Sequence, residues 1–295
     1  MASTISAQGP EPELGPEPER ATSSQPSSTA KAEMHLLPMT ICSGKAAIQH
    51  ATATYAEAFS TDPYQRYSLT PIRPSSSNDK ATHPIHSPAV RTHLWRYLVT
   101  QAAVNGGHIV NATGDWSSVG IYFDPGTSDA GSTRMLLPFP PHTGGSSVLG
   151  TALWIVVRVG PRMLWRGAAY DAALRRLRKR YFKAERLRRR DFFYVAVLAT
   201  LEGRRGEGLG SAWIRWLQAR AAEVGRPVWL ETSTEGARRM YERCGFRCVG
   251  CERMGVGWVD EEGWWVEDER ARREAKGVAL WGMVWWPEGV EEERR

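Results

Sequence analysis

The chain has 295 residues, and its 38 Lys and Arg outnumber its 32 Asp and Glu, giving a net charge of +6. With 42% hydrophobic residues and 13 Trp it can bury a substantial core, which excludes a chain that is disordered throughout. Four cysteines are too few for a disulfide scaffold at this length. The positive charge suggests a phosphate-bearing partner: nucleic acid, an anionic membrane or a phosphorylated small molecule. The composition alone does not distinguish between these three kinds of partner.

Residues 1–38 are polar and low in complexity, with five acids and two bases. Such a segment cannot bury enough apolar surface to offset its ordering entropy, so we expect a disordered tail before one domain over residues 39–290. The first 30 residues carry no charged and apolar signal segment. The longest apolar stretch, 148–165, is broken by two arginines and falls short of the ~20 apolar residues of a membrane helix. We expect an intracellular protein without a membrane partner, in the cytoplasm or alternatively the nucleus.

The first half of the expected domain contains both helical and strand patterns. Apolar residues at helical spacing predict a helix over residues 43–59, which ends at the Asp62-Pro63 turn. A second helix is predicted over residues 90–104. Residues 108–111 and 118–123 are rich in apolar residues and flank a Gly-Asp turn, which predicts an antiparallel hairpin.

Residues 174–190 hold ten Lys or Arg and one Glu. Five of their apolar residues recur at three- and four-residue steps: Leu174, Leu177, Tyr181, Ala184 and Leu187. This pattern favours an amphipathic helix with a solvated basic face, and leaves contact with a phosphate or a substrate as the alternative. The aromatic and β-branched run over residues 192–200 then predicts a central strand.

A glycine-rich loop over residues 201–211 follows that strand and leads into a predicted helix over 210–224. A strand, a glycine loop and a helix N-terminus together make a site for phosphate, because the first N–H groups of the helix lack partners. A Walker A loop is excluded because no Gly-Lys-Ser/Thr follows. A dinucleotide fingerprint is excluded because its third glycine comes one residue early, at Gly210.

The loop does contain Arg205-x-x-Gly208-x-Gly210. This resembles the acetyl-CoA pyrophosphate loop, Arg/Gln-x-x-Gly-x-Gly/Ala, of the GNAT superfamily of N-acetyltransferases. After a predicted strand over 227–232, a short helix ends in Tyr241-x-x-x-Gly245-Phe246, which resembles the second signature of the same superfamily. These two motifs lie within residues 192–246. Smaller features resemble the fungal small-molecule branch: the Leu198-Ala199-Thr200 lead-in, the Asp62-Pro63 turn and the Met283-Val284 closing strand.

The resemblance implies an α/β fold, with a mixed, strongly bent central sheet, helices on both faces and an acetyl-CoA-binding core at about 192–250. It implies transfer of an acetyl group from acetyl-CoA, a co-substrate used without a metal, to a primary amine of a small molecule. Tyr241 would act as general acid and Glu231 as general base. Their structural alternatives are a packing aromatic and a salt-bridged strand residue. The implied acetyl-CoA contacts are Leu198, Ala199, Thr200, Arg205, Gly206, Glu207, Gly208, Leu209, Gly210 and Ser211.

The chain departs from the family pattern in three places. Glu202 replaces a frequent proline, and Glu235-Gly236 replaces an asparagine that many members carry. Residues 257–276, with three Trp among acids, indicate an insertion between the last two strands. We expect the substrate-side residues in the loops at 60–90 and 124–147.

Other interpretations remain open. Cys244-x-x-x-Cys248-x-x-Cys251 has the spacing of the iron–sulfur signature of radical S-adenosylmethionine enzymes. That signature opens a long barrel, whereas 44 residues follow here, so we expect ordinary reduced cysteines. His108 or His142 could reach the site from the substrate side. The alternative functions are a protein or peptide N-acetyltransferase, or a basic nucleic-acid-binding module with a vestigial acetyl-CoA site. The acceptor amine and the oligomeric state stay unassigned.

Overall fold

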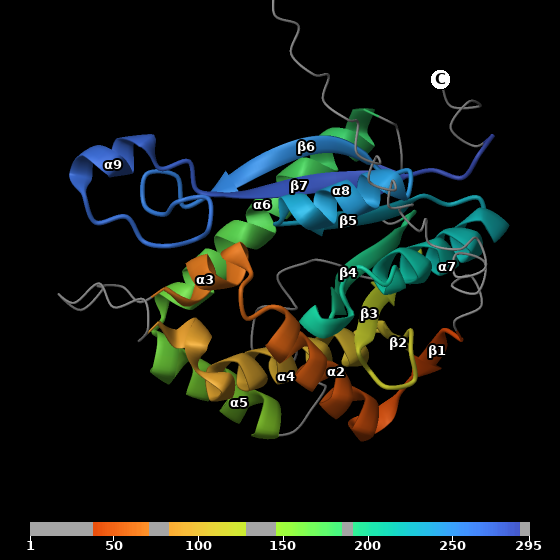
Figure 1. The fold of residues 1–295 in the computed structure, drawn as a ribbon, viewed down its shortest axis with the longest axis horizontal. Coiled ribbons are helices and arrows are strands. Elements are labelled where there is room, and N and C mark those ends of the chain that lie inside the picture. The colour runs from red at the N-terminus through yellow and green to blue at the C-terminus, as the bar shows by residue number, and fades with distance from the viewer. Residues whose placement is uncertain (1–37, 71–82, 128–145, 185–190, 290–295) are drawn as a thin grey trace, which may run out of the picture.

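The computed structural model describes residues 38–70, 83–127, 146–184 and 191–289 (Figure 1), so the expected tail over 1–37 lies outside the described residues. The strands are β1 (Thr40–Cys42), β2 (His108–Asn111), β3 (Ser118–Phe123), β4 (Phe193–Thr200), β5 (Val228–Thr232), β6 (Arg247–Met254) and β7 (Val278–Trp285). They form one sheet in the order β1-β2-β3-β4-β5-β7-β6. All neighbouring pairs are antiparallel except β4 and β5. The expected mixed sheet is confirmed.

The helices surround this sheet. They are α2 (Gly44–Ala58), α3 (Pro63–Leu69), α4 (Pro88–Val104), α5 (Ser146–Val159), α6 (Arg162–Ala184), α7 (Leu209–Glu223), α8 (Glu235–Arg243) and α9 (Glu269–Glu274), with the 3-10 turns η3 (Pro84–His86) and η5 (Glu202–Arg204). Within the described part of the chain, no helix is both long and apolar enough to cross a membrane.

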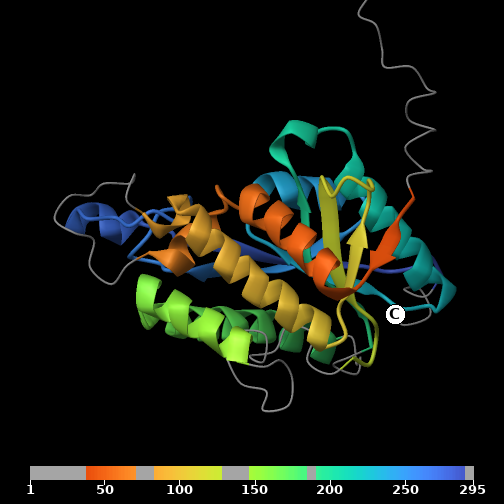
Figure 2. The same cartoon turned by 90° about the horizontal axis from the view of Figure 1, so that it is seen from below.

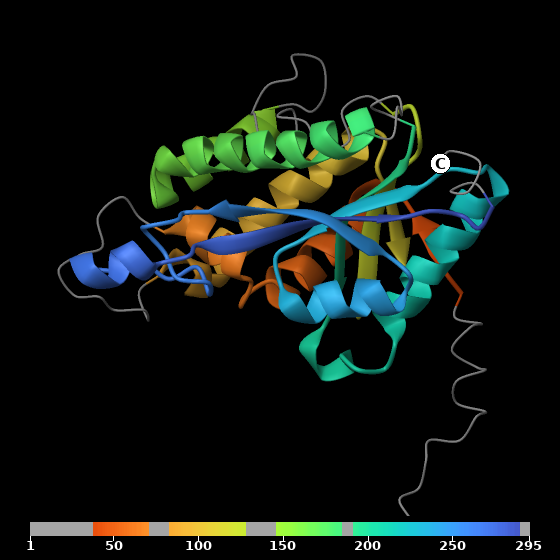
Figure 3. The same cartoon turned by 90° about the horizontal axis from the view of Figure 1, so that it is seen from above.

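Successive strand residues point into two different hydrophobic cores, as the pleat of a sheet requires. Ile121 and Trp229 lie in the core formed with α2, α4 and α6. Val195 and Leu230 lie in the opposite core, formed with α7 and α8. Figure 2 shows α2 and α4 side by side, and Figure 3 shows α6 and α8 on opposite sides of β6 and β7. Helices therefore cover both faces, as expected.

An irregularity in β4 opens the sheet near its middle. The register between β3 and β4 shifts so that Ile121 and Tyr122 face Val197 and Val195, which leaves Ala196 as an extra residue. Such a bulge bends its strand and ends regular pairing. The parallel pairing of β4 with β5 stops at Val195, and the rest of β4 pairs with β3 alone. The two halves of the sheet diverge beyond this point (Figure 1).

Most elements predicted in the motif-bearing half agree with the structure, but the helix predicted over 174–190 begins too late. The helix α6 already starts at Arg162, and residues 185–190 lie outside the described residues. The apolar stretch over 148–165 is also helical, but it belongs to two helices. Gly160, at φ 99°, and Pro161 separate the end of α5 from the start of α6. The turn at Asp62 also begins a helix, since its side chain caps α3 by accepting from Gln65 N.

Three acids neutralise part of the positive charge of the basic helix. Four arginines of α6 have partners: Arg175 with Asp171 at 2.6 Å, Arg178 with Glu231 at 3.4 Å, and Arg176 and Arg180 with Glu252 at 3.0 and 3.1 Å. Leu174 and Leu177 are buried. In the described part of α6 the structure agrees with the favoured interpretation, an amphipathic helix packed on the sheet.

The Trp-rich insertion lies between β6 and β7, as expected, and contains α9. It packs against α3. The Arg66 guanidinium lies 4.7 Å from the Trp264 ring, and a Cβ at Gly263 would clash with the carbonyl of Pro63. The insertion thus holds in place the helix that begins after Asp62.

Candidate active site

A cavity of about 1010 Å³ begins where β4 and β5 diverge. One part, here called the loop end, is bordered by the β4 edge, the glycine-rich loop and α8, with Thr200, Gly210 and Tyr241 in its wall. The other part, here called the helix end, is bordered by α3, α4, α5 and α6. Two parts that differ in composition are therefore joined in one space.

Backbone groups of β4 face the loop end. Leu201 N donates to Ser117 O across the β3–β4 ladder. Because N–H directions alternate along a strand, the N–H groups of Leu198 and Thr200 point the other way, toward the side that β5 has left. A backbone N–H on such an open edge can donate to a carbonyl oxygen that becomes negative during a reaction.

The glycine-rich loop has the geometry of an anion site. Gly206 and Gly208 have φ of 91° and 81°, a region that other residues adopt only with strain. Gly208 is the N-cap of α7 and offers no side chain to its first N–H groups. A Cβ at Gly206 would meet open space, so a ligand can approach the backbone closely. These features fit a phosphate group at the start of α7.

The two arginines of the loop fix it in place. Arg204 lies 2.9 Å from Asp115 and 2.6 Å from Glu207, which ties the loop to the β2–β3 hairpin. The side chain of Arg205 donates to Ala58 O at 3.0 Å, at the end of α2. Arg205, which the family resemblance implies as an acetyl-CoA contact, holds the loop to the end of α2 in this structure.

The predicted site residues divide into two groups. Seven line the cavity: Leu198, Ala199, Thr200, Arg205, Gly210, Glu231 and Tyr241. Five are outside its lining: Gly206, Glu207, Gly208, Leu209 and Ser211. Of these five, Leu209 is buried in the protein, whereas the two glycines shape the loop. The structure thus brings both predicted catalytic residues and the strand edge into one cavity.

The motif around Tyr241 is the end of a helix. Gly245 has φ 84° and donates to Glu242 O, while Phe246 N donates to Tyr241 O. This is a Schellman cap, completed by the contact between the Tyr241 and Phe246 rings at 5.7 Å. Burial raises the pKa of Tyr241. The phenol therefore stays protonated and can donate a hydrogen bond.

Glu231 forms a buried ion pair. Its side chain is 3% exposed, its Oε1 accepts from Trp229 Nε1 at 2.7 Å, and Arg178 Nε lies 3.4 Å away. The guanidinium of Arg178 also lies over the Tyr194 ring. Glu231 is thus the salt-bridged strand residue that sequence reasoning held as its alternative role, and it also lines the cavity.

Asp62 lies in the range 60–90 in which substrate-side residues were expected, but it was not itself predicted as a site residue. It lines the cavity and is buried, and its Oδ2 accepts from Ser233 Oγ at 2.6 Å. Burial raises the pKa of Asp62. No Lys or Arg of the described residues lies within ion-pair distance of it. The Asp-Pro pair signals a helix cap, but nothing local signals Ser233, which lies 171 residues along the chain.

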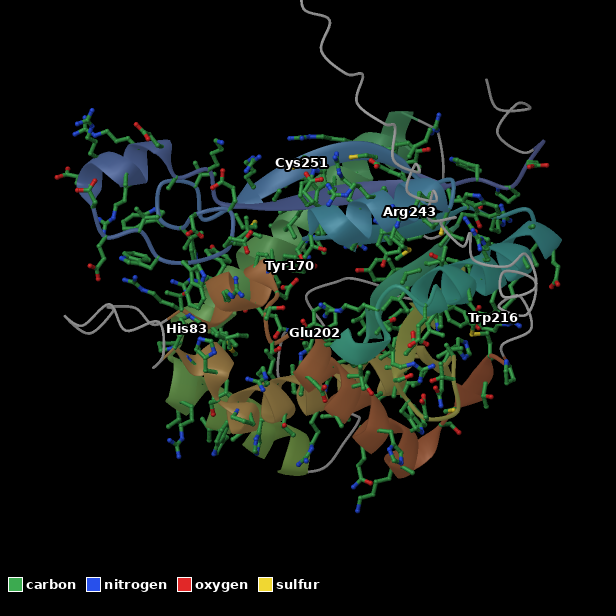
Figure 4. The ribbon with its side chains drawn as sticks, in the orientation of Figure 1. His83, Tyr170, Glu202, Trp216, Arg243 and Cys251 are labelled. Atoms are coloured by element: carbon green, nitrogen blue, oxygen red, sulfur yellow. The ribbon has the colours of Figure 1, made fainter. Side chains whose placement is uncertain are left out.

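Tyrosines and an amide surround Asp62. Tyr64 and Tyr170 stack with ring centroids 4.1 Å apart, and burial raises the pKa of both. Tyr170 reaches the cavity from α6 and is labelled in Figure 4. Gln65 also lines the cavity, and its buried Oε1 has no hydrogen-bond partner among the described residues. Asp62 and Gln65 thus form a polar part of the wall, whereas the residues of α4 and α5 that line the cavity are aromatic or aliphatic.

The remaining candidate residues lie elsewhere. His108 pairs with Asp124 at 2.8 Å and is not part of the cavity wall, and His142 lies outside the described residues. Cys244 is buried at the end of α8, whereas Cys248 and Cys251 are exposed on β6. Among the residues that the structure describes, no group of three His, Cys, Asp or Glu could hold a metal ion.

Comparisons with solved structures give similar chains of low identity. Arylalkylamine N-acetyltransferase 2 from Aedes aegypti has 14% identity and a TM-score of 0.48, covering 84% of this chain and 98% of its own. A structure of histone acetyltransferase HPA2 and related acetyltransferase from Corynebacterium glutamicum has 16% identity and a TM-score of 0.43, covering 84% and 95%. A polyamine N-acetyltransferase from Drosophila melanogaster has 12% and 0.42, covering 84% and 100%. Similarity at this level gives no argument about substrate.

A comparison with curated proteins finds no match. In contrast, residues 166–246 match the model of the acetyltransferase (GNAT) family. This match runs from α6 to the end of α8 and contains both sequence motifs and the bulged strand. Residues 166–246 of the chain are therefore similar to the acetyltransferase (GNAT) family.

Proposed function

We propose that this protein transfers an acetyl group from acetyl-CoA to a primary amine of a small molecule. The observation that carries this proposal is that a single cavity joins the loop end to the helix end. The loop end offers backbone donors for a phosphate and a carbonyl, and the helix end offers the carboxylate of Asp62. The likeness to the fungal small-molecule branch is part of this proposal.

On the coenzyme side, backbone N–H groups would supply most of the hydrogen bonds to acetyl-CoA. The N–H groups at the start of α7 would bind the pyrophosphate, and Gly206 and Gly208 let it approach. The Leu198 N–H would donate to the thioester carbonyl oxygen and stabilise the negative charge that develops there. Arg205 would add a charged donor while it holds the loop to α2.

On the acceptor side, Asp62 is the carboxylate best suited to receive an ammonium group. Glu231, assigned as the base from the sequence, is already compensated by Arg178. Among the described residues, Asp62 accepts hydrogen bonds from the uncharged donors Ser233 Oγ and Gln65 N. We therefore assign proton removal to Asp62 and keep Glu231 as the second candidate base.

The reaction balances without a further reactant. The ammonium loses one proton to Asp62, and the nitrogen lone pair then forms the C–N bond at the thioester carbon. Collapse of the tetrahedral intermediate breaks the C–S bond. Of the two protons that the nitrogen loses, one ends on the departing thiolate and the other reaches solvent.

Tyr241 would assist the departing thiolate. Because burial raises its pKa, complete proton transfer to a thiolate, whose conjugate thiol has a pKa near ~8.5, is less favourable than for an ordinary phenol. A hydrogen bond from Tyr241 still stabilises the thiolate until it is protonated. In this proposal Tyr241 therefore stabilises the thiolate by donating a hydrogen bond, and the general-acid role that the family resemblance implies is its alternative.

The proposal is tested by incubating the purified protein with acetyl-CoA and a panel of small primary amines, and measuring thiol release. Release that depends on an amine supports it. Release that occurs only with a peptide N-terminus or a lysine peptide would favour the protein N-acetyltransferase alternative. Binding of DNA or RNA that weakens steeply with salt, without any acetyl transfer, would favour the nucleic-acid module.

A further inference from the structure

One carboxylate of the cavity forms no ion pair with a described residue, although the nearby charge of Arg66 acts on it. Three carboxylates line it: Asp62, Asp171 and Glu231. Asp171 is paired with Arg175 at 2.6 Å, and Glu231 with Arg178 at 3.4 Å. Of the described basic side chains, none lies within ion-pair distance of Asp62. The cavity therefore has a place for one positive charge, not for several.

A second observation marks the same place as polar. Gln65 is 5% exposed, lines the cavity, and its Oε1 has no hydrogen-bond partner among the described residues. A buried carbonyl oxygen without a donor is costly, and an ammonium N–H would satisfy it. An ammonium has three N–H donors, so one ammonium can bond Asp62 and Gln65 together.

The walls that lead away from Asp62 are apolar. They comprise leucines, a valine and a methionine of α4, α5 and α6: Leu94, Leu98, Leu153, Val156, Met163 and Leu164. Leu153 is 65% and Leu164 38% exposed, so the apolar wall continues to the protein surface. A second ammonium along this wall would be desolvated without a partner, at a large cost. An apolar tail would instead gain by leaving water.

We propose that the acceptor is a monoamine with an apolar tail, whose ammonium binds Asp62 and whose tail follows the wall of α4, α5 and α6. This inference rests on the proposed function and names the substrate class of the same cavity. It excludes diamines and polyamines as preferred acceptors.

A matched pair of amines tests it. Hexylamine and 1,6-diaminohexane have the same length and differ in the second amine. We measure their affinities by calorimetry for the unmodified protein saturated with coenzyme A, so that no turnover is needed. Hexylamine should bind at least about 100-fold more tightly, because the second ammonium would be buried unpaired. Across propylamine, butylamine and hexylamine, each added methylene should tighten binding by about three- to fourfold.

A variant sharpens the test. Leu164→Glu places a carboxylate on the apolar wall at a partly exposed position, where a change is tolerated. It should move the hexylamine to diaminohexane ratio at least about 10-fold toward the diamine. The control is Val224→Glu, since Val224 is 57% exposed and outside the cavity wall. It should leave the ratio unchanged.

Equal binding of the two amines, tighter binding of the diamine, or no binding of either would overturn the inference. So would an affinity that does not rise with chain length. The proposed function fails on a different observation, the absence of amine-dependent thiol release with every amine of the panel. A protein that acetylates diamines best would keep the proposed function and lose the substrate class.

Discussion

The two ends of the cavity are built from different chemical groups. The loop end presents backbone N–H groups of β4 and of the α7 N-terminus, held by positive-φ glycines and by arginine contacts to distant backbone and acids. The helix end presents side chains from α3 to α6, with one carboxylate and an apolar wall. In the proposed function, backbone donors bind the phosphate and the thioester of acetyl-CoA, which are the same whichever amine is acetylated. Side chains can be substituted without altering the fold, so we expect the side chains of the helix end to determine which amine binds.

This contrast predicts that substitutions in one end leave the ligand of the other end bound. Gly208→Val should have the largest effect on acetyl-CoA binding, because a branched residue at φ 81° moves the N–H groups at the start of α7. Loss of two charge-assisted hydrogen bonds would weaken acetyl-CoA binding at least ~100-fold. Calorimetric titration measures it. Gly289→Val is the control, since Gly289 also has φ 81° but lies outside the cavity wall. Unchanged acetyl-CoA affinity in Gly208→Val would contradict the loop assignment.

Asp62→Asn should damage the helix end alone. Loss of the general base should lower kcat/KM for the amine by about 10²–10⁴. Acetyl-CoA affinity should not change. Glu231→Gln is the comparison that separates the two candidate bases, and Asp191→Asn, at a pair with Arg226 outside the cavity wall, is the control. A larger rate loss in Glu231→Gln than in Asp62→Asn, with both proteins folded, would return the role to Glu231.

The same variant has a stability signature. The folded state raises the pKa of Asp62, so it binds that proton more tightly than the unfolded chain does. The ionised carboxylate thus costs stability as pH rises above the ordinary carboxyl value. Asp62→Asn should be more stable than the unmodified protein near neutral pH, and this advantage should disappear in acid. Thermal melts across pH measure it. A less stable Asp62→Asn protein at neutral pH would show that the hydrogen bonds of the carboxylate outweigh its burial.

Tyr241→Phe keeps the Schellman cap and the ring contact with Phe246 but removes the hydroxyl. One hydrogen bond to a charged thiolate should be worth about 10- to 100-fold in turnover. Turnover and acetyl-CoA affinity are compared by steady-state rates and calorimetry, and only turnover should fall. An unaltered turnover would leave Tyr241 with a packing role.

Two glycine substitutions should change stability in opposite directions. A Cβ at Gly120 on β3 would clash with the buried Trp213 of α7, so Gly120→Ala should cost about 1–3 kcal/mol. A Cβ at Gly150 on α5 meets open space, so Gly150→Ala should stabilise by about 0.5–1 kcal/mol. Chemical denaturation measures both. Equal changes would mean that α7 is not tightly packed on β3.

His83, which lies outside the cavity wall and contacts Thr70 after α3, gives a prediction about stability and not about either ligand. Burial lowers the pKa of His83 to about 4. Its neutral ring accepts from Ile85 N and contacts Thr70 Oγ1. The folded protein should therefore lose stability as pH falls from about 6.5 toward 4, because the unfolded chain binds the proton first. His83→Gln should flatten this part of the stability profile. An identical profile would show that the ring titrates freely.

The loop end was predictable because its determinants are local in sequence. Gly208 and Gly245 occupy positive-φ positions that few residues tolerate, so the motifs report backbone geometry directly. The bulge at Ala196 follows from no such pattern, but it lies next to Leu198, Ala199 and Thr200, which the family resemblance implies as acetyl-CoA contacts.

The helix end was not predictable for the opposite reason. Asp62 and Ser233 are hydrogen-bonded although they lie 171 residues apart in the sequence. Glu231 pairs with Arg178 of α6, and the charge pattern of that helix did not identify its partner. The start of that helix was also misplaced, because Gly160 and Pro161 divide one apolar run into two helices. Pairings of this kind are set by the tertiary fold and not by spacing.

The most direct test of the central claim is a one-pot assay with the unmodified protein, acetyl-CoA and hexylamine, in which free thiol and N-acetylhexylamine are both quantified. A cavity that joins coenzyme and amine predicts that the two products form in equal amounts and that thiol release stops without the amine. Thiol release at the same rate with and without hexylamine, or the absence of any acetylated amine, would contradict the account.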